Sequence, residues 1–345
     1  MPICITLLSW LFFSATFELH ENKQNMALFI VAVAISSLAI VVCATKKTFM
    51  SKSEIKRLIE AKITQDGVIE TGIKGVQLFR VTESMRCAPA VYEPCVIAII
   101  SGAKQAILDG KHIIYDENRY MCCPISMPVE AGTPTASPDN PLLGVMISLD
   151  TKTMTELSIE MAASGGHKNK YKTGSQGLSL ARWDDTFTDA LLRLLQLQGS
   201  ELDIAVLAAS RLRELYFAVL KGDAGEAARA AFGVGNEIAR SIEYLSSRLH
   251  ESVTIEEMAE QVGMSRAVLH RKFKQATAMS PIQFVKTMRL NTAAMKIATG
   301  VSVNVAAMAV GYQSSSQFSR EFKRLYGQSP KQWSQTTELP QGAIV

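Results

Sequence analysis

The sequence lacks the residue patterns that hold a metal or build a nucleophilic active site. Its 345 residues include six cysteines and five histidines, but the cysteines show neither the two-residue spacing nor the nearby histidine of a zinc site. A lone His112 within residues 75–150 cannot supply the His-x-His pattern of a metal-binding β-barrel. No Gly-x-Ser-x-Gly occurs, Gly233-Val-Gly235 lacks a third glycine, and Gly110-Lys111 precedes histidine where a P-loop needs Ser or Thr. We therefore expect no enzyme activity, no metal site and no cofactor.

The chain as a whole has only a small excess of charge. Lysine and arginine total 36 against 32 acidic residues, which gives a net charge of +4. The segment from Asn236 to Trp333 alone holds 13 basic and 7 acidic residues. The basic character is therefore a property of the C-terminal third.

The first fifty residues differ in composition from the rest. Residues 26–45 carry no charge and are long enough to cross a bilayer as a helix. Basic residues follow and would keep the downstream chain on the cytoplasmic side: Lys46, Lys47, Lys52, Lys56 and Arg57. Two interpretations stay open for residues 1–49, a transmembrane anchor or a start codon assigned too early, with Met50 or a nearby Met as the true start.

Residues 75–150 have the pattern of antiparallel β-structure. The apolar run from Val91 to Ile100 is flanked by turn-forming residues at the short intervals typical of a sandwich or small barrel. Residues 182–197 and 202–220 instead repeat Leu, Ile and Ala at three- and four-residue intervals, which predicts amphipathic helices on the barrel. A turn at Gly222 precedes a short Ala-rich helix that ends near Phe232.

The cysteines are scattered, which makes a disulfide framework improbable and fits a reducing cytosol. The adjacent Cys122 and Cys123, together with Cys87 and Cys95, nevertheless raise the hypothesis of a thiol sensor that an oxidant or electrophile modifies. The alternative is that these thiols are small buried side chains of the core, which is the commoner role of free cysteine.

The C-terminal third contains an internal repeat with the pattern of a helix-turn-helix. Residues 255–263 match residues 303–311 at an offset of 48, and Leu269, Phe273 and Ser280-Pro281 match Phe318, Phe322 and Ser329-Pro330 at an offset of 49. In each copy a small alanine (Ala259, Ala307) allows close helix approach, a glycine (Gly263, Gly311) supplies the turn, and a serine (Ser265, Ser315) is available to cap the second helix.

The second helix of each copy has a polar, basic outer face. Arginine can pair with guanine in the major groove, serine and histidine can read donors or acceptors, and lysine neutralises phosphate. A solvated surface is the ordinary role of such a face, but two tandem units in one basic region favour DNA recognition. The predicted DNA-binding residues are Arg266, Ala267, His270, Arg271, Lys274, Ser315, Ser316, Ser319, Arg320 and Lys323.

These residues resemble the DNA-binding domain of AraC/XylS-type transcription regulators. The resemblance rests on Ile255–Phe273, Ser280-Pro281 with Phe284, Val303–Phe322 and the closing Gly327-Gln-Ser-Pro-Lys-Gln-Trp333. The upstream region is similar to the N-terminal domain of an AraC subgroup, through Tyr92-Glu93-Pro94, Gly102-Ala103-Lys104-Gln105, Pro128-Val-Glu-Ala131, Ala136-Ser-Pro-Asp139, Trp183-Asp184 and Asp189-Ala-Leu-Leu192. The resemblance implies a cupin-like β-barrel sensor followed by helices.

The sequence thus predicts an α+β protein with three parts: the apolar segment 1–49, a cupin-like effector or dimerisation domain at 50–232, and an AraC-type DNA-binding domain at 236–335 with two helix-turn-helix units. The expected function is sequence-specific transcription regulation on double-stranded promoter DNA, together with RNA polymerase. A small-molecule effector, a homodimer and membrane association through residues 26–45 stay open. We expect a cytoplasmic, DNA-associated protein. The alternative is a membrane-tethered sensor that receives its signal at the bilayer, with an anchor in the inner membrane.

Overall fold

The computed structural model describes residues 51–164, 177–233, 236–251 and 253–336. The chain divides into an N-terminal segment of residues 1–51 and a compact body of residues 52–345. The predicted anchor at residues 26–45, and with it the membrane-tethered alternative, lies outside the described residues. Within the described ranges, no helix is both long enough and apolar enough to span a membrane.

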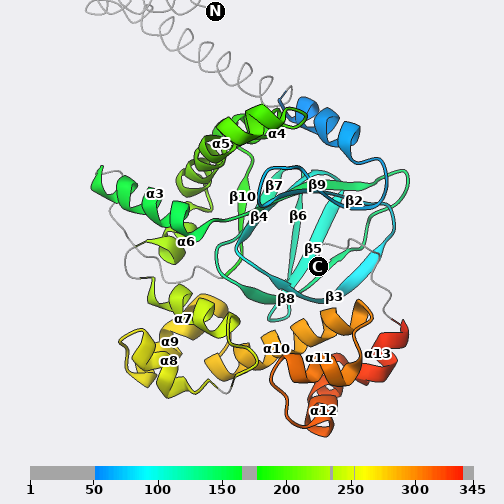
Figure 1. Ribbon diagram of the computed structural model, residues 1–345, viewed down its shortest axis with the longest axis vertical. Coiled ribbons are helices and arrows are strands. Elements are labelled where there is room, and N and C mark those ends of the chain that lie inside the picture. Colours follow the sequence, from blue (N-terminus) through cyan, green and yellow to red (C-terminus); the bar gives the residue numbers. More distant parts are fainter. Residues whose placement is uncertain (1–50, 165–176, 234–235, 252, 337–345) are drawn as a thin grey trace, which may run out of the picture. The chain divides into compact units, whose positions relative to one another are not determined.

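The N-terminal half of residues 52–345 is built from two antiparallel sheets (Figure 1). One sheet has the strand order β1-β2-β9-β4-β7-β10 and the other β3-β8-β5-β6. The strands are β1 (Gly67–Glu70), β2 (Val76–Val81), β3 (Met85–Tyr92), β4 (Cys95–Ser101), β5 (Ala103–Leu108), β6 (Lys111–Asp116), β7 (Arg119–Cys123), β8 (Met127–Thr133), β9 (Leu142–Ser148) and β10 (Ser179–Arg182).

The predicted α+β class is confirmed, but the expected closed barrel is not. From β2 to β9 the chain passes repeatedly from one sheet to the other. The two sheets are joined by these connections and not by strand pairing, whereas a closed barrel has continuous pairing around its circumference. One such connection contains Gly102, where a φ of +77° and a close approach to the Leu142 backbone both disfavour a side chain. In the described chain the result is a two-layer sandwich with open sheet edges.

The apolar run predicted at Val91–Ile100 is divided between two strands. Strand β3 ends at Tyr92 and β4 begins at Cys95, because Pro94 has no backbone N–H with which to continue a ladder. Strand β4 has neighbours on both sides, and all of its residues except Ser101 are buried. This explains why its sequence is apolar without alternation.

Helices pack on the β-sandwich, and three of them correspond to the helices predicted at residues 182–197, at 202–220 and before Phe232, whereas the helices at 51–62 and 151–163 were not predicted. The helices are α3 (Thr151–Ala163), α4 (Asp185–Leu195), α5 (Glu201–Lys221) and α6 (Gly225–Phe232), preceded by a helix that ends at residue 62. Helix α4 begins where the Asp184 carboxylate accepts a hydrogen bond from the Phe187 amide at 2.7 Å. Phe187 is fully buried and stacks on Tyr120 of β7 with ring centroids 4.0 Å apart, which fixes α4 on the larger sheet.

The C-terminal part is entirely helical among the described residues. Its helices are α7 (Glu237–Ser246), α8 (Ile255–Gln261), α9 (Arg266–Thr277), α10 (Pro281–Ala298), α11 (Val303–Ala309), α12 (Ser315–Tyr326) and α13 (Pro330–Thr336). Helix α10, which connects the two halves of the repeat, begins at Pro281 because Ser280 caps it and proline is favoured in the first turn. Figure 1 shows α10 beside β3 and β8, which it contacts.

Candidate nucleic-acid interface and the neighbouring cavity

Each repeat forms a helix-turn-helix, with α8 and α9 in the first unit and α11 and α12 in the second. Ser265 caps α9, as predicted, by accepting a hydrogen bond from the Val268 amide. The cap of α12 is Ser314 and not the predicted Ser315, which is the first helical residue. Ser314 lies 49 residues after Ser265, so the one-residue insertion of the second repeat falls in the turn, between Gly311 and Ser314.

Both turns depend on glycine, and the second does so more strictly. Gly263 has a φ of +67° with open space around it, whereas Gly311 has a φ of +89°. A Cβ at Gly311 would lie 2.8 Å from the carbonyl oxygen of His250, in the loop between α7 and α8. The turn of the second unit is therefore packed against the backbone that leads into the first unit.

Buried aromatic and aliphatic residues hold the two recognition helices, α9 and α12. Leu269 and Phe273 of α9 are fully buried, and Phe273 makes an edge-to-face contact with Phe284 of α10 at 5.2 Å. Phe318 and Phe322 of α12 are equally buried. Because the buried residues recur every four positions, they lie on one face of each helix, and the opposite face points outward.

The predicted DNA-binding residues lie on these outward faces. All ten are exposed except Ser319, which is half-buried. Arg266 is paired, since its Nη1 lies 2.8 Å from Oε1 of Glu256 on α8. Within the described part of the chain, no hydrogen bond or ion pair engages the side chain of Arg271, Lys274, Arg320 or Lys323. These four cations are available to an anionic partner.

The charged residues that hold the recognition helices are not among those predicted from the sequence. Lys272 of α9 lies on the inner side, where its Nζ is 3.9 Å from Oε2 of Glu237 on α7. In the second unit Lys286 of α10 lies 3.2 Å from Oε2 of Glu321 on α12. The partners are related by the repeat offset of 49, but with charges exchanged. The sequence contains a signal for these ion pairs: at the offset of 49, an acidic residue in one repeat corresponds to a basic residue in the other.

Glu321 is the centre of a polar cluster between α10 and α12. Its Oε2 accepts a hydrogen bond from the Tyr312 hydroxyl at 2.9 Å, and its Oε1 accepts one from Gln317 at 3.3 Å. Burial raises the pKa of the Glu321 carboxyl, but the hydrogen bonds from Tyr312, Gln317 and Lys286 outweigh burial, and the net pKa is below its ordinary value. Glu321 therefore stays ionised and holds α12 in place.

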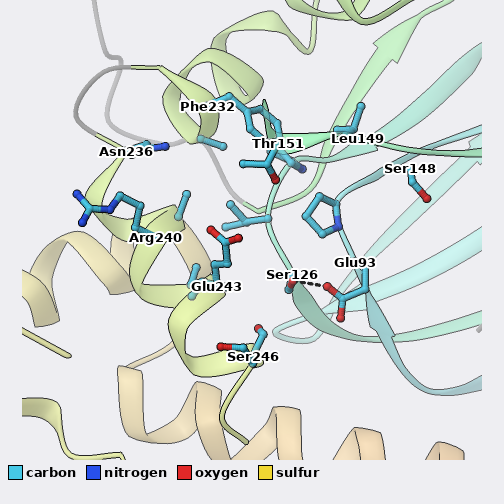
Figure 2. Close-up of a pocket in the computed structure, with 17 residues that line it drawn as sticks. Glu93, Ser126, Ser148, Leu149, Thr151, Phe232, Asn236, Arg240, Glu243 and Ser246 are labelled. Carbon is cyan, nitrogen blue, oxygen red and sulfur yellow. Dashed lines mark hydrogen bonds between the residues drawn. The ribbon is translucent and has the colours of Figure 1, made fainter. Parts of the chain in front are cut away.

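A cavity of about 480 Å³ lies between α7 and the ends of the β-strands. Figure 2 shows the Glu243 and Asn236 side chains pointing toward it, whereas the guanidinium of Arg240 points away. On the strand side, the Ser126 hydroxyl donates a hydrogen bond of 2.5 Å to the Glu93 carboxylate. The hydroxyl of Ser246, also in the lining, is buried and has no hydrogen-bond partner among the described residues. The cavity is thus lined by acidic, amide, hydroxyl and apolar groups.

The adjacent cysteines of the thiol-sensor hypothesis precede Pro124, which lines this cavity, but their side chains are buried. Cys122 and Cys123 are fully buried, and burial is the largest cause that raises the pKa of each thiol. Successive residues of a strand point to opposite faces, so these two thiols do not face each other. Burial favours the packing interpretation for Cys122. No group of three or more potential metal ligands occurs in the described ranges.

Two family models match the chain. The model described as AraC-type transcriptional regulator N-terminus matches residues 72–227, and the helix-turn-helix domain model matches residues 258–336. An uncharacterised HTH-type transcriptional regulator of Haemophilus influenzae is 41% identical over 86 residues, which are 25% of this chain and 29% of that protein. The HTH-type transcriptional regulator MtrA of Neisseria gonorrhoeae is 41% identical over 80 residues, 23% of this chain and 27% of MtrA. The match thus spans less than a third of either relative.

Solved structures with similarity to the chain include two regulators. Wild-type ToxT of Vibrio cholerae with bound unsaturated fatty acid is 11% identical, with a TM-score of 0.47 over 78% of this chain and 95% of ToxT. The C-terminal domain of AraT, a response regulator of Geobacillus stearothermophilus, is 27% identical with a TM-score of 0.29 over 31% of this chain and 89% of that domain. On the two matching models and the tandem helix-turn-helix units, the chain belongs to the AraC/XylS-type family of DNA-binding transcription regulators.

Proposed function

We propose that α9 and α12 read promoter DNA and that the β-sandwich, in response to a small-molecule effector, controls this reading through α10. The supporting observation is the hydrogen bonding of Asn291, a buried polar residue in the middle of α10. Its Nδ2 donates to the carbonyl oxygens of Ala90 at 2.8 Å and Val129 at 2.9 Å. Ala90 and Val129 are directly opposed on β3 and β8, so one amide bridges two strands of the sandwich.

The same side chain also contacts the second recognition helix. Oδ1 of Asn291 accepts a hydrogen bond of 2.7 Å from the hydroxyl of Tyr326, the last residue of α12. A displacement of β3 or β8 is therefore transmitted to α10 and α12 through fixed hydrogen bonds. In the first unit the equivalent position, 49 residues earlier, is the apolar Ile242 of α7. The packing of a unit does not itself need an amide here, which supports a role in docking on the sandwich.

Helix α10 also sets the separation of the two recognition helices. Its 18 residues span about 27 Å at 1.5 Å per residue. Successive major-groove segments on one side of B-DNA lie roughly 34 Å apart, and the bodies of the two units add to the span of α10. One chain can thus place α9 and α12 in adjacent segments, provided that α10 is free to adjust.

The cavity beside α7 is our candidate for the effector site. Its lining combines strand-end residues such as Glu93 and Ser126 with α7 residues such as Glu243 and Ser246. A molecule bound there would contact the sandwich and the first helix of the DNA-binding region together. Such a molecule would alter the contact between the sandwich and α7.

The test replaces Asn291 by isoleucine, the residue at the equivalent position of the first unit. We expect Asn291→Ile to fold and to bind the specific promoter fragment at least fivefold more tightly than the unaltered chain, because α10 is released from β3 and β8. Gln283→Ala, at an exposed position of α10, is the control and should change nothing. Equilibrium titrations with specific and scrambled DNA measure the effect. Unchanged affinity in a folded Asn291→Ile variant would show that the docking does not control DNA binding.

A further inference from the structure

Two cysteines far apart in the sequence face each other across a strand pair. Cys95 is the first residue of β4 and Cys123 the last residue of β7, and the antiparallel register places them directly opposite each other. Directly opposed residues project from the same face of a sheet, with Cα atoms about 4.5–5.5 Å apart. A disulfide requires Cα atoms about 4.4–6.8 Å apart. The register thus meets this requirement, and both cysteines are free thiols in the structure.

The adjacent Cys122 does not have this relationship. Its cross-strand neighbour on β4 is Val96, and its side chain points to the other face of the sheet from that of Cys123. The thiol with a cysteine partner is therefore Cys123, and its partner is Cys95, not its neighbour in the sequence.

The pair lies at the edge of the cavity beside α7. Pro94, immediately before Cys95, and Pro124, immediately after Cys123, both line that cavity. Strand ends open more easily than strand centres, so a small molecule in the cavity can reach this end of the β4–β7 pair without unfolding of the sandwich. Cys95 retains 4% exposure and Cys123 none. Cys95 is the thiol that is reached first.

We propose that Cys95 and Cys123 form a site of reversible covalent modification, oxidised to a cross-strand disulfide by a low-molecular-weight disulfide such as glutathione disulfide. In the first step the Cys95 thiolate attacks one sulfur of glutathione disulfide, a mixed disulfide forms and one glutathione thiolate leaves. In the second step the Cys123 thiolate attacks the Cys95 sulfur, and the second glutathione thiolate leaves. Two protein thiols are oxidised, one glutathione disulfide is reduced, and the two protons go to the two glutathione thiolates.

The surroundings of the two thiols agree with this order of attack. Burial raises the pKa of the Cys95 thiol to about 12, and the ammonium of Lys104 partly opposes that rise. For Cys123, burial raises the pKa well above its ordinary value, and the nearby Cys95 and Cys122 add to the rise. Thiolate formation is therefore easier at Cys95, and the reaction is slow until the strand end opens.

The experiment treats the reduced, full chain with glutathione disulfide, blocks the remaining thiols by alkylation, and maps disulfides by mass spectrometry without reduction. Chymotryptic cleavage after Tyr92 separates Cys87 from Cys95. We expect a peptide containing Cys95 linked to the peptide containing Cys122 and Cys123. The link should form equally in Cys122→Ser, and should be lost in Cys95→Ser and Cys123→Ser. Dithiothreitol should reverse it.

The variants distinguish this site from the vicinal pair. A link that disappears in Cys122→Ser but persists in Cys123→Ser would overturn the proposal. So would the absence of any link in the native chain under conditions in which the urea-unfolded chain reacts. If Cys95→Ser does not fold, the comparison of the unaltered chain with Cys122→Ser and Cys123→Ser still shows which of the two cysteines is linked to Cys95. None of these readouts depends on DNA binding, so the proposed control through Asn291 is tested separately.

Discussion

Lys286 and Glu321 in the second unit occupy the positions that Glu237 and Lys272 occupy in the first, with the charges exchanged. The nitrogen–oxygen distance is 3.2 Å between Lys286 and Glu321 and 3.9 Å between Lys272 and Glu237. In each unit an ion pair ties the recognition helix to the helix that precedes the helix-turn-helix. The two units thus use the same geometry with opposite polarity, so neither recognition helix finds a matching partner on the other unit's supporting helix.

Neutralising Glu321 should destabilise the protein in a pH-dependent way. The folded-state pKa of Glu321 is below its ordinary value, so its contribution is present above the unfolded-state pKa and is lost as the pH falls through the folded-state pKa. Glu321→Gln should therefore lower the free energy of unfolding by about 1 kcal/mol at pH 7, and the difference should disappear at a pH below the folded-state pKa. Urea unfolding measures it. Glu260→Gln, at an exposed position, should show no such dependence; an equal loss at both pH values would exclude the charge as the cause.

The exposed arginines and lysines of α9 and α12 should contribute differently to DNA binding. Arg271→Ala and Arg320→Ala should each cost roughly 1 to 3 kcal/mol on the specific site and relax base preference within one half of the footprint. Lys274→Ala and Lys323→Ala should weaken binding to all sequences and lower the salt slope by about one each.

Binding titrations of these four variants on specific and scrambled DNA, over a range of salt concentrations, make the comparison. Equal loss of specific and scrambled affinity in the arginine variants would mean that the helices grip only the phosphate backbone. Arg266→Ala is the matched control for a cation already paired, with Glu256, and should have the smallest effect of the arginine changes.

The two turn glycines should differ in their tolerance of alanine. Both have positive φ, which costs a non-glycine residue roughly 1 to 2 kcal/mol. Only at Gly311 would the added Cβ also meet backbone, 2.8 Å from the His250 carbonyl oxygen. Gly263→Ala should thus cost about 1 kcal/mol of unfolding free energy, and Gly311→Ala clearly more. Thermal and urea unfolding of the two variants give the ranking; equal costs would show that the backbone at His250 yields.

Glycine should stabilise the end of α9. Ala278, the residue that ends α9, has a left-handed φ of +62°, and its counterpart after α12 is Gly327 with a φ of +75°. Ala278→Gly removes the strain of a Cβ in that conformation, which exceeds the added flexibility of the unfolded chain, and should stabilise by about 0.5 kcal/mol. Gly327→Ala should have the opposite sign. A destabilised Ala278→Gly variant would contradict this account.

The sequence by itself determined the local features of the DNA-binding region. The turn glycines, Ser265, the inward Leu269 and Phe318 and the exposed basic faces follow from helix periodicity and from backbone preferences within a few residues. The repeat made these preferences visible twice. The cap of α12 at Ser314 was misassigned to Ser315 because two neighbouring serines satisfy the same local rule, and only the insertion in the turn distinguishes them.

Tertiary structure alone decided the contacts between distant segments. The division of the strands between two sheets, the opposition of Cys95 and Cys123 and the docking of Asn291 on Ala90 and Val129 depend on strand order and register, which local patterns do not specify. A polar side chain in the middle of an apolar helix looks unfavourable in the sequence. It becomes understandable only when the carbonyl oxygens that satisfy it are in place, because a buried amide is stable only with its hydrogen bonds made.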